Sequence, residues 1–179
     1  PFENMSADKD NEYFSDGITE EILNSLAQIK ELRGISRTSV FTYKERTDVG
    51  IAKIGRELDV SHVLEGSVRK AGNKVRITAQ LIRSKDDAHL WSQTYDRSLD
   101  DIFQVQTEIS EAIAQQMKIK LVGSTVIERR GITNKPEALE LYMQARYEMN
   151  KMSEKSLHKA IQLFKDAITI DPEYALANS

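Results

Sequence analysis

The chain has 179 residues, enough for one ordinary domain and part of a second, and 40% of them are apolar while 30% are charged, as expected of a globular fold. The formal net charge of −3 argues against a nucleic-acid-binding domain, which usually presents a basic face. The sequence has no run of about 18 apolar residues that would span a membrane, and because it has no cysteine it excludes disulfides, thiol catalysis and cysteine-based metal sites.

The N-terminal third predicts two helices and a short strand. Residues 3–15 are polar and are expected to form a loop. Asp16 is then a candidate N-cap, because it precedes an apolar stripe at helical spacing that consists of Ile18, Ile22, Leu26 and Ile29. Residues 32–36 predict a short strand, and a second helix is expected over 51–58.

Three β-like runs follow, at 62–70, 74–83 and 89–97. The second run alternates apolar and polar residues with a period of two, which is typical of a strand with one buried and one solvated face. A turn signal at 71–73 joins the first two runs into a predicted β-hairpin. We interpret Pro1-Phe2 as the tail of a truncated leading strand, which would leave a sheet edge open for homo-oligomerisation.

The second half of the chain is expected to be mainly helical. Residues 99–121 predict the strongest helix, because apolar residues recur there at helical spacing. Residues 123–135 show no sustained pattern and are interpreted as a linker. We therefore expect an α/β domain over 1–122 with a mixed sheet flanked by helices, the linker over 123–135, and a helical repeat over 136–179.

The C-terminal helices carry a repeat pattern. Ala160, Phe164 and Ala167, followed by Pro172, match the second half of the tetratricopeptide (TPR) signature, in which small residues let two helices approach closely. Ala145 belongs to the first half, but it lies about three residues too far from the second half, so we expect a long interhelix loop. The alternative is a generic helical hairpin. A lone repeat cannot bury its apolar face, so it must pack on further repeats or on the α/β domain.

A family resemblance rests on ordered blocks in the first 120 residues. The blocks are Pro1–Asn4, Glu12–Gly17, Arg37–Ser39, Ile54–Leu58, Val63–Arg69, Arg76–Leu81, Leu90–Trp91 and Tyr95–Arg97. In this order, and with the TPR segment behind them, they resemble the TolB N-terminal-like (FlgO-like) domain. That domain occurs in bacterial proteins described as adenylate or guanylate cyclases and in winged-helix regulators with TPR repeats.

The resemblance implies an α/β accessory module for binding or assembly, with no known ligand or cofactor. In the cyclase-like members the catalytic domain lies upstream of a membrane anchor, which would place this region on the extracytoplasmic side. The anchor lies outside this chain, so any membrane association depends on that other segment, and a cytoplasmic location stays open.

No constellation of catalytic residues is apparent. The three histidines, His62, His89 and His158, lie far apart, and none has the spacing of a metal-ligand motif. The sequence also has no phosphate-binding glycine loop and no nucleophile elbow. We therefore predict no catalytic residue, no metal and no cofactor in this chain.

Two polar clusters are candidate sites. Arg37, Thr38 and Ser39 follow the predicted short strand, where loops commonly bind ligands, and they would suit a carboxylate or phosphate. The alternative is a turn that bonds to its own backbone. The second cluster is an acidic stretch, interpreted as helix capping and a solvated helix face, with a cation site or acid/base pair as the alternative. It consists of Glu12, Asp16, Glu20 and Glu21.

Three functions are compatible with these expectations. The first is a non-catalytic sensory and protein-interaction region of a bacterial signalling protein, whose TPR surface binds a protein or peptide. The second is a fragment of a nucleotide cyclase whose catalytic domain lies outside this chain. The third is a structural spacer between a membrane anchor and the repeats.

Overall fold

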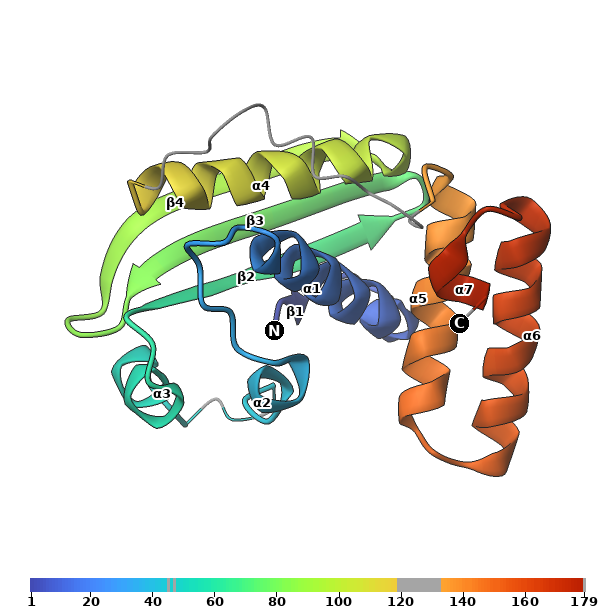
Figure 1. The fold of residues 1–179 in the computed structure, drawn as a ribbon, viewed down its shortest axis with the longest axis horizontal. Helices are drawn as coiled ribbons and strands as arrows, with labels where there is room; N and C mark the ends of the chain where they lie inside the picture. The colour runs from blue at the N-terminus through green and yellow to red at the C-terminus, as the bar shows by residue number, and fades with distance from the viewer. Residues whose placement is uncertain (45, 47, 119–132, 179) are drawn as a thin grey trace.

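A four-stranded mixed sheet forms the centre of the computed structural model, which describes residues 1–44, 46, 48–118 and 133–178 (Figure 1). The strand order is β1-β2-β3-β4, and β1 is parallel to β2 while the other neighbours are antiparallel. The strands are β1 (Glu3–Asn4), β2 (His62–Ala71), β3 (Lys74–Arg83) and β4 (Ala88–Ser98). This confirms the expected mixed sheet with flanking helices.

The register of the strands follows from the alternating pattern. Val68, Ile77 and Tyr95 are paired across β2, β3 and β4, and all three are buried. The pairing of β2 with β3 also depends on Gly66, because a Cβ atom at this position would lie 2.0 Å from the carbonyl oxygen of Thr78. A larger residue there would force the two strands apart.

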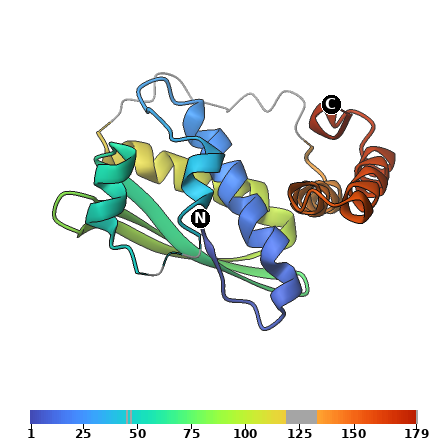
Figure 2. The same ribbon diagram turned by 90° about the horizontal axis from the view of Figure 1, so that it is seen from below.

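Two helices cover the same face of the sheet, as the second view shows (Figure 2). They are α1 (Glu12–Ala27) and α4 (Ile102–Gln116). Phe14, Ile18 and Ile22 of α1 enter the main core together with apolar residues of α4 and the strands. Of the predicted stripe, Ile18, Ile22 and Leu26 lie in α1 and pack in this core, whereas Ile29 follows the end of the helix. Burial of such a stripe is what holds an amphipathic helix on a sheet.

The beginning of the chain differs from the expectation. The expected loop over 3–15 contains β1, a short 3-10 helix at Lys9–Asn11 and the first residues of α1. Asp16 is therefore not an N-cap, because α1 begins at Glu12 and Asn11 occupies the cap position. The expected stripe began at Ile18, but Phe14 in the first turn is already buried against the sheet, four residues before it.

The expected strand over 32–36 is absent, and this segment has no regular secondary structure. It leads into the short helix α2 (Arg37–Phe41), and α3 (Ile51–Leu58) follows where a helix was expected. The helix expected over 99–121 is found as a 3-10 turn at Leu99–Asp101 followed by α4. Positions 119–121 and most of the expected linker lie outside the described residues.

The C-terminal part is a helical hairpin of α5 (Pro136–Asn150) and α6 (Glu154–Ile170), followed by the short α7 (Ala175–Asn178). Residues 151–153 alone connect α5 with α6, so the expected long loop is wrong. Both helices extend far enough to take up the additional residues, and Ser153 begins α6 with a capping box to Ser156. Within the described ranges, no helix is long and apolar enough to cross a membrane.

Candidate functional site

The predicted ligand-binding residues Arg37, Thr38 and Ser39 form the first turn of α2 rather than a loop after a strand. The Ser36 side chain caps this turn by accepting a hydrogen bond from the Ser39 backbone N–H at 3.4 Å. The Arg37 guanidinium lies 4.1 Å from the centre of the Phe41 ring, and Thr38 is exposed. The three side chains do not converge on one point, and their binding of a ligand stays a prediction.

Arg37 instead contacts the acidic face of α1. Its Nε atom donates a hydrogen bond of 2.9 Å to Oε2 of Glu20. The other carboxylate oxygen of Glu20 accepts a hydrogen bond of 2.5 Å from Arg146 in α5. One carboxylate therefore joins three elements, α1, α2 and α5, and its side chain is only 15% exposed.

A second ion pair joins α5 to the sheet. Lys70 of β2 lies 2.5 Å from Oε1 of Glu140 in α5, and Tyr13 of α1 donates a hydrogen bond to the same carboxylate oxygen. Burial, aided by this carboxylate, raises the pKa of the Tyr13 phenol far above its ordinary value, so the hydroxyl keeps its proton and remains a donor.

Gly17 provides the close approach between α1 and α5. A Cβ atom at this position would lie 2.4 Å from Cγ and 2.9 Å from Cβ of Met143. Met143 is buried, and together with Leu139 it belongs to the same core cluster as the sheet-facing residues of α1. Met143 therefore fills the space that a side chain at position 17 would occupy.

We call these contacts the α1–α5 junction, defined by Tyr13, Gly17 and Glu20 of α1 with Glu140, Met143 and Arg146 of α5. Figure 2 views α5 nearly end on while α1 is seen from the side, so the two helices cross at this point. The hairpin thus packs on the α/β part of the chain, which was one of the two alternatives left open by the sequence.

The acidic stretch of α1 neither caps the helix nor forms a solvated face. Lys44 lies 2.6 Å from Oε1 of Glu12 and also contacts Asp16. Burial raises the pKa of Asp16, and the hydrogen bond from Lys44 opposes that rise. In the described part of the chain, no three histidine or acidic residues are grouped so as to hold a metal ion. The contacts made by these carboxylates serve to join elements of the fold.

The residues of the predicted TPR signature lie in or beside the hairpin interface. Ala145, Ala160 and Ala167 are buried, as expected for small residues between closely packed helices. The Phe164 ring lies 5.8 Å from the Tyr142 ring, and Pro172 follows two residues after α6 ends. This geometry is compatible with a TPR unit, while the assignment itself remains a prediction.

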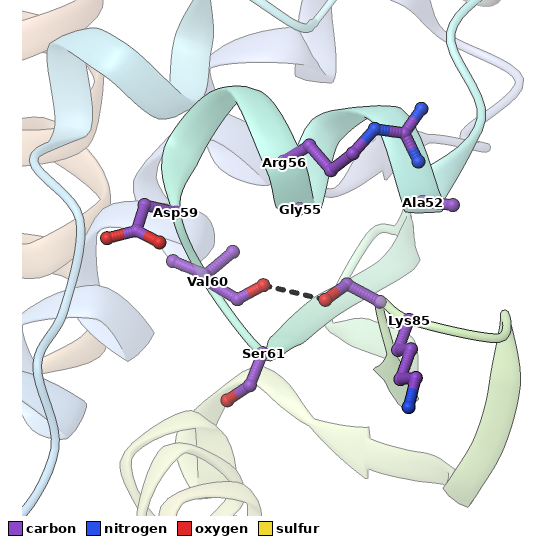
Figure 3. Close-up of a pocket in the computed structure, with 8 residues that line it drawn as sticks. Ala52, Gly55, Arg56, Asp59, Val60, Ser61 and Lys85 are labelled. Carbon is purple, nitrogen blue, oxygen red and sulfur yellow. Dashed lines mark hydrogen bonds between the residues drawn. The ribbon is translucent and has the colours of Figure 1, made fainter.

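An open hollow between α3 and the ends of β2 and β3 has a volume of about 550 Å³ (Figure 3). Arg56 and Lys85 line it, but in the close-up they extend in different directions. The Ser84 hydroxyl already donates a hydrogen bond of 2.6 Å to the Val60 carbonyl. The hollow therefore shows no converging set of polar groups, and the α1–α5 junction is the stronger candidate site.

Three basic residues that contact α1 or the junction were not predicted from the sequence: Lys44, Lys70 and Arg146. They lie far from α1 in the chain, so no local spacing marks them. One signal was present: Tyr13, Gly17 and Glu20 recur at intervals of four and three residues, and they therefore share a helix face that is distinct from the apolar stripe.

Comparison with known proteins adds one relative in sequence. No family model matches the chain. A protein of Rhizobium meliloti (strain 1021) named "Putative adenylate cyclase 3" is 41% identical over 181 residues, an alignment that covers 100% of this chain and 30% of that protein. The chain thus spans less than a third of the length of this curated relative.

Solved structures show only distant similarity. The C-terminal domain of LpoB from Salmonella enterica has a TM-score of 0.43 at 18% identity, covering 54% of this chain and 77% of that one. Lipoprotein GNA1162 from Neisseria meningitidis has a TM-score of 0.46 at 18% identity, covering 68% of this chain and 95% of that one.

Proposed function

We propose that this chain is a non-catalytic sensory and protein-interaction region of a bacterial signalling protein of the adenylate-cyclase-like kind. The observation that carries the proposal is the α1–α5 junction, in which Glu20 binds both Arg37 and Arg146. Through it, a change in the α/β part is transmitted to the helical hairpin. The name of the Rhizobium relative, of which this chain matches 30%, supports the signalling context.

The finer part of the proposal is a TolB N-terminal-like domain followed by TPR repeats, with the hairpin binding a protein or peptide. The buried alanines of α5 and α6 support the repeat. The short α7 also supports it, because this additional helix packs against α6. The sequence blocks that resemble the TolB-like family support the first part, and the cyclase reaction itself is assigned to sequence outside this chain.

Turnover measurements test the non-catalytic role. The purified chain is incubated with ATP or GTP and Mg²⁺ or Mn²⁺, and cyclic nucleotide and hydrolysis products are quantified against a buffer blank. We expect no product above the blank. Product that persists after a second purification step, and that co-elutes with the chain, would sink the proposal in favour of an enzyme.

Signalling measurements in the full protein test the coupling. Arg146→Ala removes the contact between α5 and Glu20, and the exposed Lys165→Ala in α6 is the matched control. We expect the output of the full protein to change with the first substitution and to stay at the parental level with the second. Equal output from all three proteins would favour the structural spacer.

A further inference from the structure

The α1–α5 junction has a constant register along both helices. Tyr13 meets Glu140, Gly17 meets Met143 and Glu20 meets Arg146. The two hydrogen-bonded pairs are separated by 127 and 126 residues, so the contacts follow each other in the same order on both helices. Helix α5 therefore contacts three features of α1 in succession: the hydroxyl of Tyr13, the position without a side chain at Gly17, and the carboxylate of Glu20.

The hairpin has an apolar core of its own, separate from the main core. Its buried members are Ala138, Tyr142, Ala167, Tyr174 and Ala177, with Leu141, Phe164 and Ile168 packed against them, and all come from α5, α6, α7 or their connections. Of the α5 side chains, Leu139 and Met143 join the other core instead. Separation of α5 from α1 would thus uncover two large apolar side chains.

The polar contacts of the junction are partly accessible to water. The Arg146 side chain is 32% exposed and that of Glu140 is 22% exposed. The buried Nε atom of Arg146 has no hydrogen-bond partner, so the guanidinium group is only partly satisfied by α1. A competing helix that offers a carboxylate at the same place would bind the guanidinium atom that Glu20 now contacts.

We propose that the face of α5 with Glu140, Met143 and Arg146 is the partner-binding surface of the hairpin, and that α1 occupies it as an internal ligand. The partner is an amphipathic helix that carries glycine opposite Met143 and a carboxylate three residues later opposite Arg146. This inference rests on the proposed function as an interaction region. It adds the chemistry of the partner and the competition with α1.

Gly17→Leu makes the competition measurable. Leucine fills the space of Met143, so the variant's own α1 leaves α5, while the α5 surface keeps its native residues. A fluorescent peptide with the sequence of residues 12–27 is titrated with the parent and the variant, and binding is followed by anisotropy. We expect the variant to bind it at least about tenfold more tightly, because the parent surface is occupied.

A peptide that itself carries Gly17→Leu is the matched control, since it cannot accept Met143. We expect it to bind the variant at least about tenfold more weakly than the native peptide. Equal affinity of the two peptides would show apolar binding without recognition and would overturn the proposal. Equal affinity of parent and variant for the native peptide would overturn it as well.

A charge exchange tests the same separation without changing Gly17. Because the chain has no cysteine, spin labels can be placed at Asn24→Cys in α1 and Lys165→Cys in α6, both exposed positions. We expect Glu140→Lys, which faces Lys70, to lengthen and broaden the distance distribution, and we expect the added Lys70→Glu to restore it. The exposed Arg76→Glu serves as the control and should leave the parental distribution.

A distribution that stays unchanged with Glu140→Lys, or that Lys70→Glu fails to restore, would contradict the competition between α1 and a partner. These readouts are independent of nucleotide turnover. If α5 separates from α1 as expected and the chain turns over nucleotide, the non-catalytic role alone is refuted. If the chain shows no turnover and α5 never separates from α1, the internal ligand alone is refuted.

Discussion

Helix α1 has two interfaces of different character. Toward the sheet it presents Phe14, Ile18 and Ile22, each no more than 1% exposed. Toward α5 it presents Gly17 and Glu20, and the contact combines close packing with ion pairs. Apolar burial is non-directional and insensitive to moderate salt, whereas ion pairs fix a register and weaken with ionic strength. One helix therefore contacts the sheet mainly by apolar burial and α5 by apolar packing together with ion pairs.

The largest expected effect lies on the sheet side. Ile18 is fully buried, so Ile18→Ala removes apolar contacts and leaves a cavity in the core. We expect a loss of about 2–5 kcal/mol in the free energy of unfolding. Urea denaturation followed by circular dichroism measures it, with the exposed Asn24→Ala of the same helix as control. A loss below that of the control would show that the helix is not held by its apolar stripe.

The next effect lies on the α5 side. Glu20→Gln keeps the shape of the side chain and removes the charge that faces Arg37 and Arg146. We expect a loss of about 1.5–3 kcal/mol at low salt and a smaller loss in 1 M salt, because screening weakens the ion pairs of the parent. Urea denaturation at both salt concentrations measures this, with the exposed Glu31→Gln as control. A salt-independent loss would mean that shape rather than charge joins the two parts.

A third test concerns the hairpin alone. Hydrogen bonds from Lys159, then Lys151, hold the pKa of Glu148 below its ordinary value of 4.5. The contribution of ionised Glu148 to the free energy of unfolding is therefore present above pH 4.5 and is lost as the pH falls through the depressed pKa. We expect Glu148→Gln to cost roughly 1 kcal/mol at pH 7 and nothing in acid. Thermal unfolding from pH 7 to pH 3 checks it, and a gap that persists at pH 3 would exclude the charge as its cause.

The smallest effect is expected on the solvated face of the sheet. Arg76 makes a bidentate contact with Asp96, at 2.6 and 3.0 Å, but both side chains are more than half exposed. We expect Arg76→Ala to cost at most about 1 kcal/mol. Urea denaturation measures this, and a loss as large as that of Glu20→Gln would remove the distinction between exposed and junction ion pairs.

The elements with an uninterrupted pattern could be predicted from the sequence. Strands β2, β3 and β4 follow from the alternation of apolar and polar residues, and α3 and the stripe of α4 follow from apolar residues at helical spacing. Burial on one face imposes both patterns. The start of α1 was missed, because Tyr13 and Phe14 lie between polar residues and Asp16 imitates a cap. The strand expected over 32–36 failed because this segment has two apolar residues, Leu32 and Ile35, which are too few to distinguish a strand from irregular structure.

The candidate site was predicted only in part. Arg37 was singled out for its charge and position, yet its observed partner is Glu20, an internal carboxylate rather than a free ligand. The contact between Glu20 and Arg146 spans 126 residues, and a single sequence carries no local signal for such a pair. The role of Gly17 could not be predicted, because the need for its missing side chain arises only when Met143 is in place.

The 126-residue separation between Glu20 and Arg146 has a consequence for the order of folding. The two strand hairpins and the α5–α6 pair close short loops, whereas this contact must close a very long one, so its entropy cost is larger. The ribosome also releases α5 only after the whole sheet has been synthesised. We therefore expect newly made chains to pass through a state with both parts formed and still unattached. In that interval, a competing helix would meet α5 before α1 does.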